Sequence, residues 1–217
     1  MRLILFGATG MVGAGVLRVA LEASDVEAVL SVGRKPCGVE HPKLRELLLP
    51  DLFDFSGVED QMTGWDACIW AIGVSSIGMD EAGYAKITEE LTLKWAHALL
   101  RLNPGMSFCY CSGSGAGGNS MWARVRQRVE GALKTMGFQH VGVVRPAFIR
   151  PAKGIWSRVR LYNVFIVLMT PLFPVLVRLT PSIATTSERL ARAMLRIVRG
   201  DADCYVLESA DINRIGK

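Results

Sequence analysis

The sequence contains few of the residues that build metal sites. Only three histidines occur among its 217 residues, and none of its five cysteines has zinc-ligand spacing with a histidine partner. No group of carboxylates and histidines suggests another metal ion. The cysteines are expected to be small buried hydrophobic residues in a reducing compartment. We therefore predict no metal site.

Targeting and low-complexity segments are also lacking. The first apolar run, residues 3–6, is too short for the core of a signal peptide. We find no internal repeat and no linker, and a composition of 50% hydrophobic and 21% charged residues excludes a disordered chain. A net charge of +5 is too small for a typical nucleic-acid binder. We predict one cytoplasmic domain over residues 1–217 that does not bind nucleic acid.

Strand and helix patterns alternate along the chain. Expected strands cover residues 3–6, 26–32, 44–49, 67–72, 106–111, 141–144 and 204–207. Expected helices cover residues 11–23, 81–102 and 121–136. A capping box at 185–188 opens a further helix that runs to residue 198, and a short C-terminal tail follows the last expected strand. Nearly continuous apolar strands indicate a parallel sheet with helices on both faces. The predicted fold class is therefore α/β, a single-domain, Rossmann-type doubly wound sheet.

The turn after the first strand is rich in glycine. Glycines 7, 10 and 13 form a GxxGxxG pattern between a strand and a helix. Such a pattern permits a tight turn, close approach of the backbone to a pyrophosphate and close packing of helix on strand. The helix N-terminus adds free N–H groups for phosphate. We predict dinucleotide binding, with a purely structural turn as the alternative; no Gly-Lys-Ser/Thr follows, which argues against a P-loop.

The second expected strand ends without a carboxylate. NAD sites usually place Asp or Glu there for the ribose 2′-hydroxyl, whereas this sequence has Arg34 and Lys35. A guanidinium pairs with a 2′-phosphate and stacks on adenine. We therefore predict NADP rather than NAD, the alternative being a solvated basic loop. Asp54 and Phe55 are expected beside the adenine if the third strand is correctly placed.

Four segments resemble the atypical short-chain dehydrogenases: residues 7–10, 71–73, 112–116 and 145–149. More narrowly, the chain resembles the Tat-interacting-protein oxidoreductase branch and its bacterial relatives, often labelled NAD-dependent epimerase/dehydratase. The resemblance covers most of the chain and implies a Rossmann fold with redox chemistry on a bound NADP. The full set of expected cofactor contacts is Gly7, Thr9, Gly10, Met11, Val12, Gly13, Arg34, Lys35, Asp54, Phe55, Ala71, Ile72, Gly73, Arg126, Pro146, Ala147 and Phe148.

The catalytic signature of this family is a Ser followed by a Tyr-x-x-x-Lys motif. Ser112 matches the Ser, and spacing aligns Trp122 with the Tyr and Arg126 with the Lys. An indole cannot accept a proton near neutrality, and a guanidinium does not titrate, although Arg126 can still hold ribose hydroxyls or a phosphate. The cofactor-holding half of the signature is therefore present without the proton-transfer half. A turn cap for Ser112 and a packed aromatic for Trp122 remain structural alternatives.

Two tyrosines lie near the predicted site. Tyr110 is expected on the strand face opposite Cys111, which makes it a poor substitute for the missing Tyr. Tyr84 is near the start of the helix that follows the fourth strand, a region that often lines the substrate cleft. It is an alternative acid/base candidate.

A long uncharged segment lies in the basic C-terminal third. Residues 161–177 carry no charge, but this length is marginal for a span, and two prolines would break it, so we exclude a transmembrane helix. Three alternatives remain: a lid over the substrate within residues 150–185, a homodimer contact, or peripheral contact of residues 158–178 with an anionic membrane.

Two functions stay open. The first is an oxidoreductase or epimerase-type enzyme on a small carbonyl or alcohol, in which Ser112 polarises the substrate oxygen and Arg126 holds the ribose. The second is a non-catalytic NADP-binding regulator or redox sensor. The retained Ser112 favours the first function, whereas Trp122 and Arg126 favour the second.

Overall fold

The structure of the protein is a computed structural model that describes residues 1–150, 182–202 and 204–217. Its centre is a parallel sheet of seven strands in the order β3-β2-β1-β4-β5-β6-β9. The strands are β1 (Arg2–Phe6), β2 (Ala28–Gly33), β3 (Leu44–Leu48), β4 (Ala67–Trp70), β5 (Ser107–Cys111), β6 (Val141–Arg145) and β9 (Val206–Glu208). This is the predicted Rossmann-type α/β fold.

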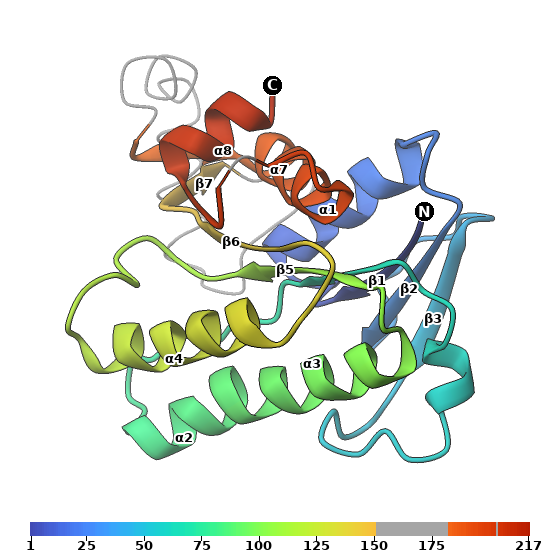
Figure 1. Cartoon of the computed structure of the whole chain (residues 1–217), viewed down its shortest axis with the longest axis horizontal. Helices are drawn as coiled ribbons and strands as arrows, with labels where there is room; N and C mark the ends of the chain where they lie inside the picture. Colours follow the sequence, from blue (N-terminus) through green and yellow to red (C-terminus); the bar gives the residue numbers. More distant parts are fainter. Residues whose placement is uncertain (151–181, 203) are drawn as a thin grey trace.

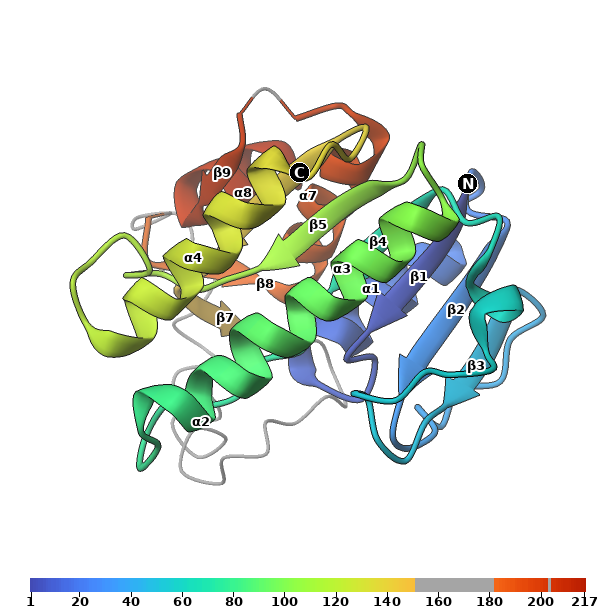
Figure 2. The same ribbon diagram turned by 60° about the horizontal axis from the view of Figure 1, so that its bottom comes forward.

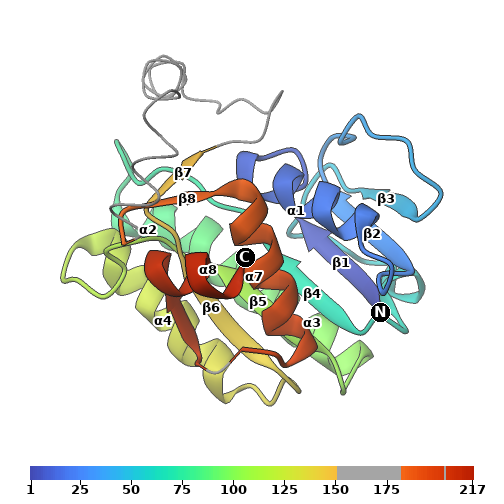
Figure 3. The ribbon, with the colours of Figure 1, turned by 90° about the horizontal axis from the view of Figure 1, so that it is seen from above.

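Helices cover both faces of the sheet (Figure 1). One face carries α1 (Met11–Glu22), α7 (Ser187–Arg199) and α8 (Ser209–Ile215), with α1 beside α7 (Figure 3). The other face carries α2 (Glu81–Ala85), the π-helical turn η2 (Lys86–Glu90), α3 (Leu91–Leu102) and α4 (Met121–Thr135). A short 3₁₀ turn, η1 (Glu59–Met62), precedes β4.

Successive side chains of β1 enter two separate cores. Leu3 and Leu5 pack with α1 and α7, whereas Ile4 and Phe6 pack with α3. The Phe6 ring lies 4.7 Å from that of Trp95 between ring centres. Because side chains alternate across a strand, a sheet covered on both faces requires apolar residues at every position. This requirement explains the continuous apolar runs from which the strands were predicted.

Most predicted strand and helix ends differ from the structure by one or two residues. The predicted helix over residues 81–102 is correct in extent but is interrupted by the π turn η2. The predicted capping box is wrong by one residue: Thr186 is the N-cap and accepts the Arg189 N–H at 3.2 Å. Glu188 instead pairs with Arg18 of α1.

Apart from the turns η1 and η2, three elements were not predicted as such. The expected C-terminal tail contains α8, and β7 (Phe148–Arg150) pairs in parallel with β8 (Ala184–Thr186) beside the main sheet. Strands of three residues are too short for a periodic signal. None of the helices among the described residues has both the length and the apolar character needed to cross a membrane. The uncharged segment 161–177 and its three alternatives lie outside the described residues.

The glycine-rich turn packs more tightly than any residue with a side chain allows. Gly7 has a φ of 82°, and a Cβ there would lie 2.6 Å from the Ala71 carbonyl oxygen. A Cβ at Gly13 would lie 2.0 Å from the Gly7 carbonyl oxygen. Glycine is therefore required at both positions for α1 to rest on the end of β1, independently of any ligand.

We expect Gly13→Ala to destabilise the protein by about 3 kcal/mol or more, because its methyl group would overlap a backbone carbonyl. Gly131→Ala is the matched control: Gly131 is also helical, but a Cβ there has no neighbour within 4 Å. That change is expected to stabilise the protein by about 1 kcal/mol. Urea denaturation of both variants measures the difference, and a Gly13→Ala variant as stable as the wild type would contradict the packing described.

Candidate functional site

The candidate site lies at the carboxyl edge of the sheet. In Figure 2 the arrowheads of β1 and β5 point toward the side of the molecule where α2 lies. Contacts join the segments that leave these strands: Gly7 after β1 approaches Ala71 after β4, and Arg126 of α4 donates to the carbonyl of Cys111 at the end of β5. The structure thus brings together segments that are far apart in the sequence.

The first turn of α1 presents backbone amides at this edge. Its N-cap is Gly10, whose own amide donates to the Gly7 carbonyl at 2.9 Å. Gly10 has no side chain that could cap the helix, and the first turn of α1 contains no acidic residue. Met11 and Val12, the first two helical residues, are half-buried. Uncapped N–H groups at a helix start suit a phosphate, so this cradle fits a pyrophosphate.

The basic residues after β2 are exposed. Arg34 and Lys35 follow the last residue of the strand, and within the described part of the chain neither side chain makes an ion pair or hydrogen bond. They lie on the same edge of the sheet as the glycine turn, because β2 is parallel to β1 and adjacent to it. Both cations are therefore accessible to an anionic group.

The loop after β3 is packed onto α3. The Asp54 carboxylate accepts the Ser56 N–H at 3.1 Å, and this hydrogen bond lowers the pKa of Asp54. The Phe55 ring centre lies 4.4 Å from that of Trp95, and Lys94 Nζ lies 5.3 Å from the Phe55 ring centre. The strand that precedes this loop is where the sequence placed it, but Phe55 already has aromatic packing partners.

Arg126 is the buried cation of the site, with 8% of the residue exposed. Its Nε donates to the Tyr84 hydroxyl at 2.9 Å, and its Nη1 donates to the Cys111 carbonyl at 3.2 Å. Its Nη2 lies on the side of Gly73, 3.8 Å from the position a Cβ would take there. Among the described residues it forms no ion pair. A buried cation without a carboxylate is costly unless its donors are used, so this position suits a ligand rich in oxygen.

The neighbouring arginines of α4 differ from Arg126. Arg124 pairs with Glu81 at 3.1 Å, and Arg128 pairs with Glu81 at 3.2 Å and with Glu89 at 2.8 Å. Exposed pairs of this kind add little to stability, but they set the direction in which α4 lies on α2 and η2. That arrangement places Arg126 opposite Tyr84.

Ser112 directly follows β5 and is buried, with 7% of the residue exposed. Its N–H donates to the Val144 carbonyl at 2.8 Å, whereas its Oγ has no hydrogen-bond partner. Buried hydroxyls without a partner are rare and costly in folded proteins. The hydroxyl is therefore a candidate for contact with a ligand, and a turn cap, the structural alternative, is not formed by its Oγ.

Trp122 lies one helical turn before Arg126 and is half-buried. Its indole covers Gly115, at 3.4 Å from the position of a Cβ on that residue, in the loop that follows Ser112. Gly115 has a φ of 87°, so this loop turns where a side chain is disfavoured. Trp122 therefore packs on the loop of the site.

Residues after β6 are fixed by a buried ion pair that the sequence did not reveal. Arg145 donates to Glu130 at 2.5 and 3.2 Å and to Glu208 at 3.1 Å. The Ala147 N–H donates to the Ser209 hydroxyl at 2.9 Å. Pro146 lies between these two anchors. Phe148, with 46% of the residue exposed, begins β7.

Three of the cysteines and Tyr110 lie in the core. Cys109 and Cys111 share one strand face and are buried, which raises the pKa of Cys111 to about 11. Burial likewise raises the pKa of Tyr110, which lies in the core on the opposite face, as predicted. The expectation of buried cysteines is wrong for exposed Cys204 and half-buried Cys37. Among the described residues no cluster of side chains suits a metal.

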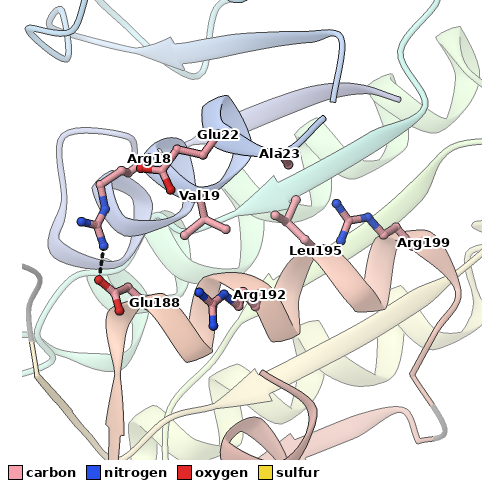
Figure 4. A pocket seen from close by; sticks show the side chains of 8 residues that line it. All are labelled: Arg18, Val19, Glu22, Ala23, Glu188, Arg192, Leu195 and Arg199. Carbon is pink, nitrogen blue, oxygen red and sulfur yellow. Dashed lines mark hydrogen bonds and ion pairs between the residues drawn. The ribbon is translucent and has the colours of Figure 1, made fainter. Parts of the chain in front are cut away.

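A groove of about 400 Å³ lies away from this edge, between the C-terminal half of α1 and α7 (Figure 4). It is lined by Arg18, Val19, Glu22, Ala23, Glu188, Arg192, Leu195 and Arg199. An ion pair between Arg18 and Glu188 crosses it. It contains none of the predicted site residues, so we do not assign the chemistry to it.

No family model matches the chain. It is 25% identical over 153 residues to "Protein FMP52, mitochondrial" of Chaetomium globosum, covering 67% of this chain and 65% of that protein. It is 30% identical over 118 residues to the leucinostatins biosynthesis cluster protein T of Purpureocillium lilacinum, covering 53% of this chain and 44% of that protein. The chain therefore spans less than two thirds of the length of these curated relatives.

Solved structures settle the fold. A short-chain dehydrogenase/reductase from Saccharomyces cerevisiae superimposes with a TM-score of 0.69 at 10% identity, over 99% of this chain and 98% of that chain. The chain shares the fold of this protein. A dTDP-glucose 4,6-dehydratase from Streptomyces venezuelae gives 0.69 at 15% identity, over 100% and 80%. The Bordetella bronchiseptica enzyme WbmH gives 0.66 at 18% identity, over 92% and 72%.

The Rossmann-type fold brings together Arg126, Tyr84 and the segment that contains Ser112. Ser112 and Arg126 were predicted from the signature, whereas Tyr84 was only an alternative, because no motif marks it. Its single sequence signal is its place near the start of the helix after β4.

Ser112→Ala is expected to stabilise the protein by about 1 kcal/mol, because it removes a buried hydroxyl that has no partner. Ser209→Ala is the matched control, since Ser209 is equally buried but its hydroxyl accepts the Ala147 N–H. That variant is expected to lose about 1–2 kcal/mol. Thermal and urea unfolding compare the two, and a destabilised Ser112→Ala variant would mean that this hydroxyl has a structural role.

Proposed function

We propose that the protein is an NADP-dependent oxidoreductase of the atypical short-chain dehydrogenase type that acts on a small carbonyl or alcohol. The observation that carries this proposal is the buried, unpartnered hydroxyl of Ser112 together with the buried guanidinium of Arg126, which donates to the carbonyl of the residue before Ser112. A buried hydroxyl without a partner and a buried cation without a carboxylate both cost stability, and a ligand that contacts them would offset that cost.

The residues at the carboxyl edge fit a dinucleotide. The amides of Met11, Val12 and Gly13 would hold the pyrophosphate. Structures of the dTDP-glucose 4,6-dehydratase and of WbmH contain NAD, which supports dinucleotide binding in this fold. The preference for NADP rests on Arg34 and Lys35, which would hold the 2′-phosphate.

Further along the cofactor, residues 71–73 would pass beneath it and residues 146–148 would close on the nicotinamide end. Arg126 would hold ribose hydroxyls. The bound nicotinamide would supply or accept the hydride. Ser112 would donate its free hydroxyl proton in a hydrogen bond to the substrate oxygen and so polarise the carbonyl.

A non-catalytic NADP-binding regulator is the second candidate. Trp122 favours it, because this residue replaces the family's acid/base with an indole and is packed against Gly115. In a regulator the same cradle would bind NADP or NADPH without turnover.

The proposed binding partners of the protein rest on the sequence alone. They are a small-molecule substrate, a second copy of the chain in a homodimer, and a membrane surface contacted by residues 158–178. A cytoplasmic location also stays a prediction, and two of the curated relatives carry the word mitochondrial in their names.

NADPH is expected to bind more tightly than NADH, and Arg34→Ala is expected to weaken NADPH binding about 10- to 100-fold, as loss of a charge-assisted contact does. Arg101→Ala is the control, because Arg101 is an exposed arginine in the last turn of α3 and no site residue. Fluorescence titration measures each dissociation constant. Tighter binding of NADH, or an unchanged Arg34→Ala variant, would refute the NADP assignment.

A panel of short aldehydes and ketones, followed by loss of NADPH absorbance, separates the enzyme from the regulator. We expect turnover of at least one panel member, with kcat/KM reduced about 10- to 100-fold or more by Ser112→Ala because the polarising donor is lost. NADPH binding should be unchanged in that variant. Tight NADPH binding with no turnover across the panel would favour the regulator.

A further inference from the structure

We propose that the Tyr84 hydroxyl is the general acid/base of the reaction, in place of the tyrosine that Trp122 replaces. This inference rests on the proposed oxidoreductase function and adds a residue that the Ser-Tyr-Lys signature does not contain.

The first argument is the state of the Tyr84 hydroxyl. Tyr84 is 1% exposed and projects from α2 toward α4. Its oxygen accepts a hydrogen bond from Arg126 Nε at 2.9 Å. Within the described residues no group accepts the proton of this hydroxyl, so that proton is free for a ligand. A buried tyrosine with only a structural role normally donates its proton to a fixed acceptor.

The second argument is the position of the pair at the site. Arg126 bridges the Tyr84 oxygen and the carbonyl of Cys111, the residue before Ser112. Its Nη2 lies on the side of Gly73, at the end of β4. One guanidinium thus connects Tyr84 of α2 to Cys111, the last residue of β5, which Ser112 directly follows. Two free hydroxyl protons at one edge suit a single substrate oxygen.

The third argument is chemical. When a tyrosine gives up its proton, the phenolate oxygen becomes negative, and a guanidinium N–H aimed at that oxygen stabilises the charge. Arg126 is permanently charged, so it acts as a positioning and stabilising residue and does not itself transfer a proton. The arrangement keeps the pairing of a phenol with a cation, although the phenol comes from α2 instead of α4.

Tyr205 is a poor candidate for this role. Its hydroxyl donates to the Glu130 carbonyl. Tyr205 lies just before β9 begins, whereas Ser112 lies just after β5 ends. Trp122 carries an N–H donor only and packs on Gly115. Tyr110 is also buried near Arg126, but of the described tyrosines only Tyr84 has an oxygen that accepts a hydrogen bond from this guanidinium.

The proton and electron balance is complete with the cofactor of the proposed function. In carbonyl reduction, a hydride from NADPH forms a C–H bond at the carbonyl carbon, and the C=O π electrons move to oxygen. The Tyr84 O–H bond breaks as its proton passes to that oxygen. The products are the alcohol, NADP⁺ and a tyrosinate, which water reprotonates.

Tyr84→Phe tests the assignment, with Tyr205→Phe as a control that also removes one phenolic hydroxyl. We expect Tyr84→Phe to lower kcat/KM for an active carbonyl of the panel at least about 100-fold, the range for loss of a general acid. The NADPH dissociation constant should change by less than about twofold, since the ring remains in place. Tyr205→Phe should retain its activity. Circular dichroism and thermal unfolding establish that both variants fold.

A second readout does not depend on turnover. The chain has four tyrosines, so carbon-13 labelling of their ring carbons gives a simple NMR spectrum, and the signal lost in Tyr84→Phe identifies Tyr84. We expect the Tyr84 signal, and not that of Tyr205, to shift when NADP⁺ is added to the wild type.

The outcomes separate the two proposals. If NADPH binds and a carbonyl of the panel is reduced, but the Tyr84 signal does not shift or folded Tyr84→Phe keeps its activity, then Tyr84 is not the acid/base and the oxidoreductase proposal stands. If neither cofactor form binds to the wild type, both proposals are wrong. If NADP⁺ shifts the Tyr84 signal but no carbonyl is reduced, the cofactor site is correct and the acid/base role is refuted.

Discussion

The contact between Gly13 and the Gly7 carbonyl is the constraint on which the rest of the site depends. Because neither position tolerates a side chain, α1 starts directly on the end of β1, and its uncapped amides face the edge of the sheet. Gly7 also lies against Ala71, so the same turn fixes the segment after β4. The shape of the phosphate cradle and the packing of the core are therefore one feature, and neither changes without the other.

The arginines of α4 have two different roles: two of them attach the helix to its neighbours, and one lies at the proposed reaction centre. Arg124 and Arg128 face solvent and find carboxylates on α2 and η2, whereas Arg126, between them in sequence, is buried with a phenol and a carbonyl as partners. The exposed pairs orient the helix, and the buried cation benefits from that orientation. This division explains how an arginine without a carboxylate is held inside the protein at the proposed reaction centre.

The sequence was sufficient for the parts of the molecule that repeat a pattern. Continuous apolar runs identified the strands of the core, and the spacing of glycines identified the turn, because both are local requirements of the backbone. The pairing of β7 with β8, the helix α8 and the π turn were missed, since each is short and is stabilised by contacts with distant residues. The contact of Tyr84 with Arg126 joins residues 42 positions apart, and no spacing rule describes it.

The π turn η2 gives the helix after β4 a property that its amino acids alone do not reveal. An additional residue in one turn rotates everything before it by about 100° relative to everything after it. The side chains of α2 are thereby rotated about the helix axis relative to those of α3, which pack in the core. Loss of one residue from η2 would leave α3 seated and swing α2 around its axis, carrying Tyr84 away from α4. The position of Tyr84 at the site therefore depends on the number of residues in η2 as well as on their side chains.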